Sequence, residues 1–383
     1  MTGFKKNAEV IIIGGGIMGL STAYNLAEQG CRDVMVLEKD LLAQASTGLS
    51  VGGIRQQFSH PANIRLSQES VKVFKNFQQK LGVDIKFQQV GYLFLTQKQN
   101  TWQDFLSAFK IQKDLGVPVE ILSPEEIKKR WSYLNVAGLK GGTFGPEDGC
   151  ADPYQAAMGY ARASRRLGVH IEEHKEVTAV MVRNGRVEGV KTPAETVSAP
   201  VVVNAAGAWG GQVARMAGFD LPVKPYRRQV FMTKAFDAMP RPVPMVVDMD
   251  VAFYFRGEEQ GILMGMSDPG EPSSFHTHVD RDFMERVVQT AVHRAPVLEQ
   301  AEILRGWGGL YAVTPDDNPI IGSFPVEGLY CAVGFSGHGF QHGPAVGRVL
   351  SDLILKKITP FDLKPFAYDR FGKSPEKGEK RVV

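Results

Sequence analysis

The sequence predicts a mixed α/β fold, α+β overall, in which a parallel-sheet unit is combined with a second, antiparallel sheet-rich unit. Continuous apolar runs at Val10–Ile13, Val34–Leu37 and 201–203 predict strands buried on both faces, as in parallel sheets. A glycine-rich turn and a helical pattern follow the first run. Strand-like segments at 91–95 and 230–232 alternate more, which favours antiparallel sheet.

The chain has 383 residues, enough for two or three domain-sized units. Parallel-sheet patterns occur at its start, middle and end. We therefore predict a discontinuous first domain over 1–85, 146–221 and 305–383. The intervening stretches, 86–145 and 222–304, are expected to form the second domain, which would bind the substrate.

Composition narrows the class of protein. The chain is 43% hydrophobic and 22% charged with a net charge of +3, which excludes global disorder and gives no footprint for nucleic acid. No apolar run is long enough for a transmembrane segment. Cys31, Cys150 and Cys331 are too scattered for a disulfide framework or a metal site, so we expect a cytoplasmic protein, membrane-associated only through a partner. The basic tail, 373–381, is expected to be frayed and solvated.

Gly14, Gly16 and Gly19 form a G-x-G-x-x-G pattern between the first predicted strand and its helix. The first glycine permits the tight turn, the second lets the backbone approach a diphosphate, and the third allows close helix–strand packing. Glu38, at the end of the second strand, would accept hydrogen bonds from ribose hydroxyls and repel a 2′-phosphate. A Rossmann-like dinucleotide-binding domain is predicted. NAD and FAD both fit this pattern, and a strand–turn–helix without ligand is the alternative.

Several segments together resemble the FAD-dependent oxidoreductases of the D-amino-acid oxidase family, which includes glycine oxidase and sarcosine oxidase. The strongest resemblance is to the β subunits of L-proline dehydrogenase and heterotetrameric sarcosine oxidase. A vertebrate mitochondrial respiratory-chain assembly factor carries a similar Gly-Gly-Ile stretch. The matching segments keep the family's order and are 10–19 with Glu38, 45–48, 52–58, 91–95, 204–209, 314–319 and 334–340.

The resemblance implies bound FAD. Ser46 and Thr47 would lie near its phosphates and ribityl chain, although a simple turn pair is the alternative. A glycine-rich helix N-terminus at 334–340 would stabilise negative charge on the reduced flavin; a plain connection is the alternative. The cofactor-binding residues implied are Gly14, Gly16, Ile17, Met18, Gly19, Glu38, Lys39, Ser46, Thr47, Gly52, Gly53, Val177, Ala206, Gly207, Trp209, Gly334, Gly337, His338, Gly339, Phe340 and Gln341.

The FAD is expected to be non-covalent. The cysteine linkage position of monomeric sarcosine oxidase falls on Gly309, and the histidine linkage position of dimethylglycine dehydrogenases falls on Leu49. No histidine lies between His60 and His170, where heterotetrameric sarcosine oxidase anchors FMN. FMN at a partner interface nevertheless stays open, because β subunits of this type work in hetero-oligomers.

The resemblance also implies a substrate site. Arg55 matches the arginine that binds the substrate carboxylate, for which a guanidinium offers two parallel hydrogen bonds; an internal ion pair is the alternative. Tyr254 and Tyr311 match pocket tyrosines, with core packing as the alternative. His338 matches a pocket histidine that is either catalytic or structural.

Two departures from the family pattern bear on activity. The second carboxylate ligand of the oxidase, a lysine, is replaced by Gln341, so the pocket loses a positive charge unless His342 restores it. The lysine that activates oxygen falls on Leu263. Without a cation there, superoxide formation is not stabilised, which favours an electron acceptor other than oxygen.

These residues predict FAD-dependent oxidation of the C–N bond of a small amino acid or secondary amine, proline-like or sarcosine-like, by hydride transfer to flavin N5. A non-catalytic FAD-binding assembly or electron-relay subunit is the first alternative. An oxidase of glycine or a 2-hydroxy acid is the second, and an NAD-linked dehydrogenase is the third.

Overall fold

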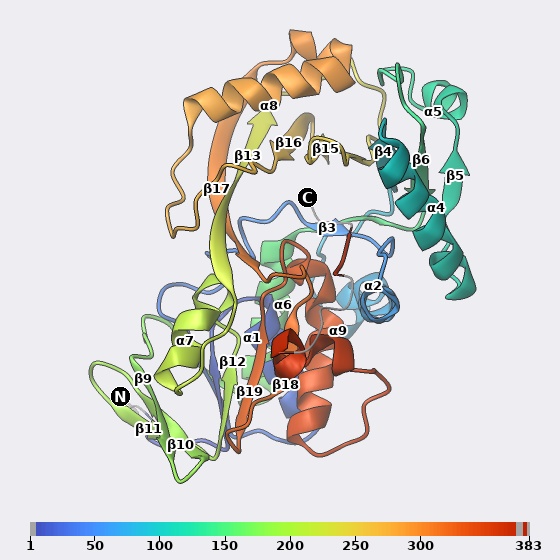
Figure 1. The fold of residues 1–383 in the computed structure, drawn as a ribbon. Helices are drawn as coiled ribbons and strands as arrows, with labels where there is room; N and C mark the ends of the chain where they lie inside the picture. Colours follow the sequence, from blue (N-terminus) through green and yellow to red (C-terminus); the bar gives the residue numbers. More distant parts are fainter. Residues whose placement is uncertain (1–4, 373–377, 381–383) are drawn as a thin grey trace.

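The computed structural model describes residues 5–372 and 378–380. Two large sheets dominate these residues. Figure 1 shows the six-stranded sheet with its helices below and the eight-stranded sheet above. A separate two-stranded sheet is formed by β3 (Gly53–Ile54) and β7 (Gly149–Cys150), and Figure 1 shows β3 between the two large sheets. The predicted combination of a parallel and an antiparallel sheet is confirmed.

The six-stranded sheet has the order β18-β19-β12-β1-β2-β8. Neighbouring strands are parallel except β18 and β19. Every residue of β1 and β2 is buried, as the continuous apolar runs predict. The strands are β1 (Val10–Ile13), β2 (Val34–Leu37), β8 (His170–Glu172), β12 (Val201–Asn204), β18 (Ile320–Ser323) and β19 (Leu329–Val333), and an antiparallel meander joins β9 (Ala179–Arg183), β10 (Arg186–Lys191) and β11 (Thr196–Ser198).

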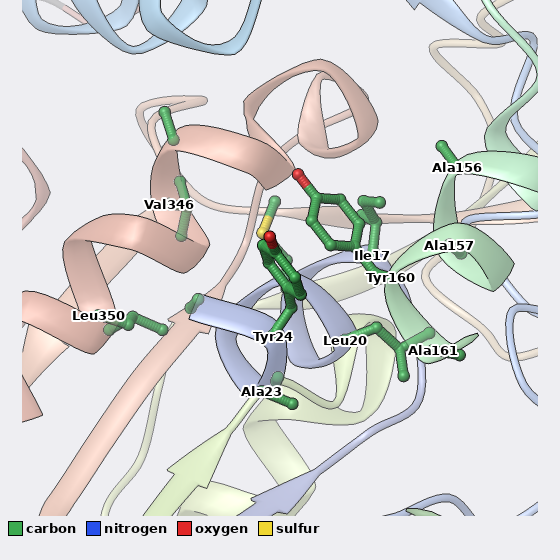
Figure 2. Packing of buried hydrophobic residues seen from close by; sticks show 14 of the residues in the cluster. Ile17, Leu20, Ala23, Tyr24, Ala156, Ala157, Tyr160, Ala161, Val346 and Leu350 are labelled. Carbon is green, nitrogen blue, oxygen red and sulfur yellow. The ribbon is translucent and has the colours of Figure 1, made fainter. Parts of the chain in front are cut away.

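Helices pack on this sheet through interlocking aromatic and aliphatic side chains. In Figure 2, Tyr24 of α1 faces Tyr160 of α6, and their ring centroids are 5.5 Å apart. Leu20 and Leu350 are fully buried in the same cluster, and each such side chain stabilises the fold by about 1.5–3 kcal/mol. The helices are α1 (Ile17–Glu28), α2 (Pro61–Lys75), α3 (Phe77–Leu81), α6 (Pro153–Arg166), α7 (Gly210–Met216) and α9 (Gly339–Ile354), with 3₁₀ turns at Gly207–Trp209, Lys364–Phe366 and Tyr368–Gly372.

The start of α9 corrects the sequence-based expectation. The sequence predicts a helix from about residue 344 to 355. The helix begins at Gly339 instead, and Pro344 lies inside it. Tertiary packing overrides the low helix propensity of the glycine-rich stretch: Phe340 packs against Phe74 of α2 at 5.3 Å between ring centroids.

The eight-stranded sheet has the order β17-β13-β16-β15-β14-β4-β6-β5 and is antiparallel except where β14 pairs with β4. Helix α8 covers it in Figure 1. Strand β17 spans the predicted boundary at 304/305, and the domain limits stay a prediction. The strands are β4 (Tyr92–Thr96), β5 (Glu120–Leu122), β6 (Gly141–Gly145), β13 (Lys224–Thr233), β14 (Met245–Asp248), β15 (Phe253–Glu258), β16 (Gly261–Met266) and β17 (Ile303–Val313); the helices are α4 (Gln99–Asp114), α5 (Pro124–Arg130), α8 (Arg281–Arg294) and a 3₁₀ turn at Pro296–Gln300.

The described end of the chain returns to the body of the protein. Glu379 is 4% exposed, and its carboxylate accepts hydrogen bonds from Ser59 N, His60 N and Asn63 Nδ2 at 2.9–3.2 Å. These donors lie at the beginning of α2, where a carboxylate is favourable. The expectation of a solvated tail is therefore wrong for Glu379, and its remaining part at 373–377 and 381 lies outside the described residues.

Candidate active site

A cavity of about 560 Å³ is lined by residues of both large sheets and of the loops that join them. The residues proposed above for cofactor or substrate line it, with the exceptions of Gly19 and His342. A Cβ on Gly19 would lie 2.0 Å from Gly14 O, so this glycine serves the close approach of helix and turn. The cavity brings together segments that are far apart in the sequence.

The turn between β1 and α1 forms one wall of the cavity. Gly14 has φ +113°, and a Cβ there would lie 2.5 Å from Ala205 O. Gly16, the N-cap of α1, has no capping side chain, so amide groups of the first turn are available to an anion. Thr47 supports this turn, since its Oγ1 accepts a hydrogen bond from Ile17 N at 3.1 Å. This wall fits a diphosphate.

Glu38 lies beside the same turn. Its Oε2 accepts a hydrogen bond from Gly15 N at 2.7 Å, and its Oε1 accepts one from Asp40 N at 2.9 Å. Each carboxylate oxygen has a second lone pair, so the group retains capacity for ribose hydroxyls. The position therefore fits the predicted nucleoside end of the cavity.

Aromatic residues also line this part of the cavity. The Lys39 ammonium lies 3.7 Å from the ring centroid of Trp209. Phe275 stacks on Trp209 with centroids 5.3 Å apart and an interplanar angle of 26°. Sequence reasoning missed Phe275, which lies in the polar loop between β16 and α8. The sequence signal that could have indicated Phe275 is an isolated aromatic residue in a polar loop.

The two covalent-linkage positions of the resembled enzymes meet in the cavity. A Cβ on Gly309 would lie 3.3 Å from Cβ of Leu49. Ser46 fixes this region by donating a hydrogen bond from its Oγ to Leu310 O at 2.7 Å. The two residues found at the linkage positions have no nucleophilic side chain for a flavin.

Arg55 lies at the end of β3, where its side chain is 6% exposed. Its backbone N donates a hydrogen bond to Gln341 Oε1 at 2.7 Å, which joins β3 to the beginning of α9. The guanidinium carbon lies 4.2 Å from the ring centroid of Phe58, a cation–π arrangement that holds the side chain in place. Gln341 thus positions Arg55 rather than adding a charge.

Three tyrosines surround this end of the cavity: Tyr254, Tyr311 and Tyr92. Burial raises the pKa of each hydroxyl, to about 12 for Tyr92. All three are therefore protonated at neutral pH and available as hydrogen-bond donors. Tyr92 follows Gly91 in a segment that resembles the family, but sequence reasoning gave it no role.

His338 and His342 are both buried near Arg55. Burial lowers the pKa of His338 well below its usual range and that of His342 to about 3. His342 faces Ser67, with 3.0 Å between Nε2 and Oγ, and it does not line the cavity. The expectation that His342 restores the missing positive charge is therefore wrong, because the ring is neutral and points elsewhere.

A buried carboxyl group, that of Asp148, is hydrogen-bonded to the two residues that follow Arg55. Asp148 is 1% exposed; its Oδ1 accepts a hydrogen bond from Gln56 N at 2.8 Å, and its Oδ2 accepts one from Gln57 Nε2 at 3.1 Å. Both donors directly follow Arg55 in sequence. Burial raises the pKa of Asp148 to about 7, although the Arg55 charge opposes this shift.

Asp148 predicts a pH dependence of stability. Its pKa rises from 3.8 in the unfolded chain to about 7 in the fold, so its contribution is full below pH 4 and is lost as pH rises through 7. Asp148→Asn removes this loss. In urea unfolding between pH 4.5 and 8, the free energy of unfolding of the variant is expected to rise relative to that of the unsubstituted protein as the pH increases. Parallel pH curves would contradict it.

Comparison with known proteins identifies the family of this chain. Residues 9–353 match the DAO family, described as FAD dependent oxidoreductase. The chain belongs to this family. The predicted resemblance and the enzyme class are thereby confirmed: this DAO-family protein is an FAD-dependent oxidoreductase. The diphosphate wall and the residues of both large sheets that line the cavity fit FAD.

Individual relatives agree with this assignment. The DAO-family chain is 34% identical to FAD-dependent oxidoreductase domain-containing protein 1 of Xenopus laevis, covering 99% of this chain and 85% of that protein. It is 29% identical to sarcosine oxidase subunit beta of an Arthrobacter species, covering 96% and 92%. L-proline dehydrogenase from P. horikoshii superposes with a TM-score of 0.90 at 33% identity, covering 96% and 99%.

Across residues 5–372 and 378–380, every helix is too short or too polar to cross a bilayer. In the same part of the chain, no three His, Cys, Asp or Glu side chains cluster as a metal site requires. The cytoplasmic location stays a prediction.

Proposed function

We propose that this protein oxidises the C–N bond of a small amino acid or secondary amine. The observation that carries the proposal is the buried Arg55 beside three protonated tyrosines, in the cavity that fits FAD. An arginine in this setting binds a carboxylate in a fixed orientation. The similarity to L-proline dehydrogenase and sarcosine oxidase subunit beta supports a proline-like or sarcosine-like substrate.

Bound FAD would supply the acceptor for a hydride equivalent from the carbon next to nitrogen. Gly14, Gly16, Thr47 and the start of α1 would hold its diphosphate, and the start of α9 would face its ring. The chain's own contribution is orientation and charge. Arg55 holds the carboxylate, while the Tyr254 and Tyr311 hydroxyls keep their protons and donate hydrogen bonds to the substrate.

The neutral state of His338 matters for the amine. A protonated histidine would compete with Arg55 for the carboxylate, and it could return a proton to the amine, which must be neutral to release a hydride equivalent. Because burial lowers its pKa well below the usual range, His338 stays neutral and leaves the carboxylate to the arginine. We propose His338 as a pocket residue and assign it no proton transfer.

We propose an electron acceptor other than oxygen. Leu263 occupies the position of the oxygen-activating lysine in the resembled oxidase, and it is 3% exposed among apolar neighbours. An apolar side chain cannot stabilise the superoxide that forms first. The similarity to a sarcosine oxidase subunit supports a partner subunit that receives the electrons.

An anaerobic screen tests the proposal. The holoenzyme is mixed with amino acids, N-methylated glycines and 2-hydroxy acids, and the visible flavin absorbance is followed. Bleaching by an amino acid or secondary amine is expected. Bleaching by 2-hydroxy acids alone would favour the hydroxy-acid oxidase. No bleaching by any of them would favour the non-catalytic FAD-binding assembly or electron-relay subunit, an alternative supported by the neutral Gln341.

Non-covalent FAD is a separate prediction. Leu49 and Gly309 cannot form the linkages found at these positions in the resembled enzymes. Trichloroacetic acid precipitation is therefore expected to release all yellow colour into the supernatant. A yellow pellet after washing would show a covalent bond elsewhere in the cavity.

A further inference from the structure

We infer that the substrate carries a second anionic group, which Arg228 of β13 binds at the wall of the cavity. The inference rests on the proposed function and narrows its substrate class to amino acids or secondary amines with two carboxylates. Arg228 lies on β13, paired with Gly309 of β17, and it lines the cavity. Sequence reasoning gave this arginine no role.

The neighbouring residue, Arg227, is an arginine that has its counter-ion within the protein. The Arg227 guanidinium binds the Glu271 carboxylate through Nε at 3.1 Å and Nη2 at 2.9 Å, and both side chains are buried. Successive residues of a strand point to opposite faces. Arg227 therefore has its counter-ion within the protein, whereas Arg228 faces the cavity.

Arg228 is poorly satisfied by the protein itself. Its Nη1 donates a hydrogen bond to Arg227 O at 2.9 Å, and its guanidinium carbon lies 5.2 Å from the ring centroid of Tyr311. Its Nε is buried and has no acceptor among the described residues. Nor does any ion pair join Arg228 to a carboxylate in that part of the chain. The guanidinium therefore retains N–H donors on the cavity side that a ligand can occupy.

Two acids are close enough for Arg228 to lower their pKa, but each is engaged elsewhere. Asp268 accepts hydrogen bonds from Arg286 Nη2 at 2.5 Å and from Gly270 N at 2.9 Å. Asp317 is hydrogen-bonded to Ser336, and burial raises its pKa. Neither acid neutralises the Arg228 charge directly.

The charge of the cavity then decides the substrate class. The acids in its lining, Glu38, Asp40 and Glu176, come from the segments that form the nucleoside end. By contrast, the Arg55 and Arg228 charges both act on the Tyr311 hydroxyl and lower its pKa against the effect of burial. The single negative charge of a monocarboxylate such as proline balances only one of the two arginine charges. A dicarboxylate would pair with both.

Carboxylate binding to the FAD-loaded protein tests the inference without turnover. The probes are matched pairs, succinate against butyrate and glutarate against pentanoate, and the readout is the shift in the flavin spectrum on titration. We expect a dicarboxylate to bind at least about tenfold more tightly than its monocarboxylate. Arg228→Met should abolish that preference and leave monocarboxylate affinity within about twofold, while Arg228→Lys should retain part of it.

Arg305→Met is the matched control. It removes one positive charge from the adjacent strand β17, at an exposed residue outside the cavity lining, and is expected to keep the full preference. The inference would be overturned if Arg228→Met weakened the binding of both ligand types equally, or if the unsubstituted protein showed no preference for dicarboxylates. A changed flavin spectrum of the ligand-free Arg228→Met variant would also overturn it, because that result would assign Arg228 to the flavin. A preserved preference without bleaching by any amine would contradict the proposed function alone.

Discussion

Arg55→Met is expected to lower kcat/KM for the amino acid or amine substrate by about 30-fold to about 4,000-fold, mainly through KM. Removing one partner of a buried, hydrogen-bonded charge pair costs about 2–5 kcal/mol, and each 1.4 kcal/mol corresponds to a factor of ten. Methionine retains the apolar contact with Phe58, over which the guanidinium lies at 4.2 Å. The loss therefore reports the carboxylate contact rather than packing. Steady-state kinetics with an artificial electron acceptor measures it.

Two controls separate binding from folding in this experiment. The FAD content of Arg55→Met should equal that of the unsubstituted protein, because Arg55 is not part of the diphosphate wall. Arg55→Lys keeps the charge but loses the planar pair of donors, so an intermediate kcat/KM is expected. Unchanged kinetics on every substrate that bleaches the flavin would remove Arg55 from the substrate site.

Gly14→Ala is expected to abolish FAD binding. The new Cβ would lie 2.5 Å from Ala205 O, and φ +113° is a conformation that alanine rarely adopts. The turn must shift, and with it the amides at the start of α1. Absorbance near the visible flavin maximum, relative to protein, measures the bound FAD after purification.

Gly30→Ala provides a matched control on the same βαβ unit. Gly30 has φ +100°, but a Cβ there has nothing within 4 Å, and the residue lies beyond the end of α1. Alanine at this position has the backbone strain of a positive φ but no steric clash with a neighbouring atom. We expect this variant to lose some thermal stability and to keep its FAD. Full FAD occupancy in Gly14→Ala would contradict the assigned diphosphate wall.

Local patterns explain why part of the fold was predictable. The run at β1, the glycines of the turn and Glu38 form one strand–turn–helix–strand unit, so the sequence periodicity and the structure report the same local interactions. The helix α9 was misplaced at its start for the opposite reason. Its first residues are helical because Phe340 packs against Phe74, far away in the sequence.

The residues of the candidate site likewise divide into those that a local sequence pattern indicates and those that only tertiary structure brings to the site. Arg55 and His338 lie in segments with a recognisable family pattern. Arg228, Phe275 and Asp148 have no such pattern, and they face the cavity or its wall only because distant strands and loops pair. The charge of His342 was also misjudged from sequence, since its neutrality depends on complete burial.

A crystal structure of the FAD-loaded protein with a bound carboxylate inhibitor tests the central claim most directly. We expect the FAD diphosphate to lie against the first turn of α1, the flavin to lie before the start of α9, and the inhibitor carboxylate to contact Arg55. A flavin ring outside this cavity, or a carboxylate bound away from Arg55, would contradict it.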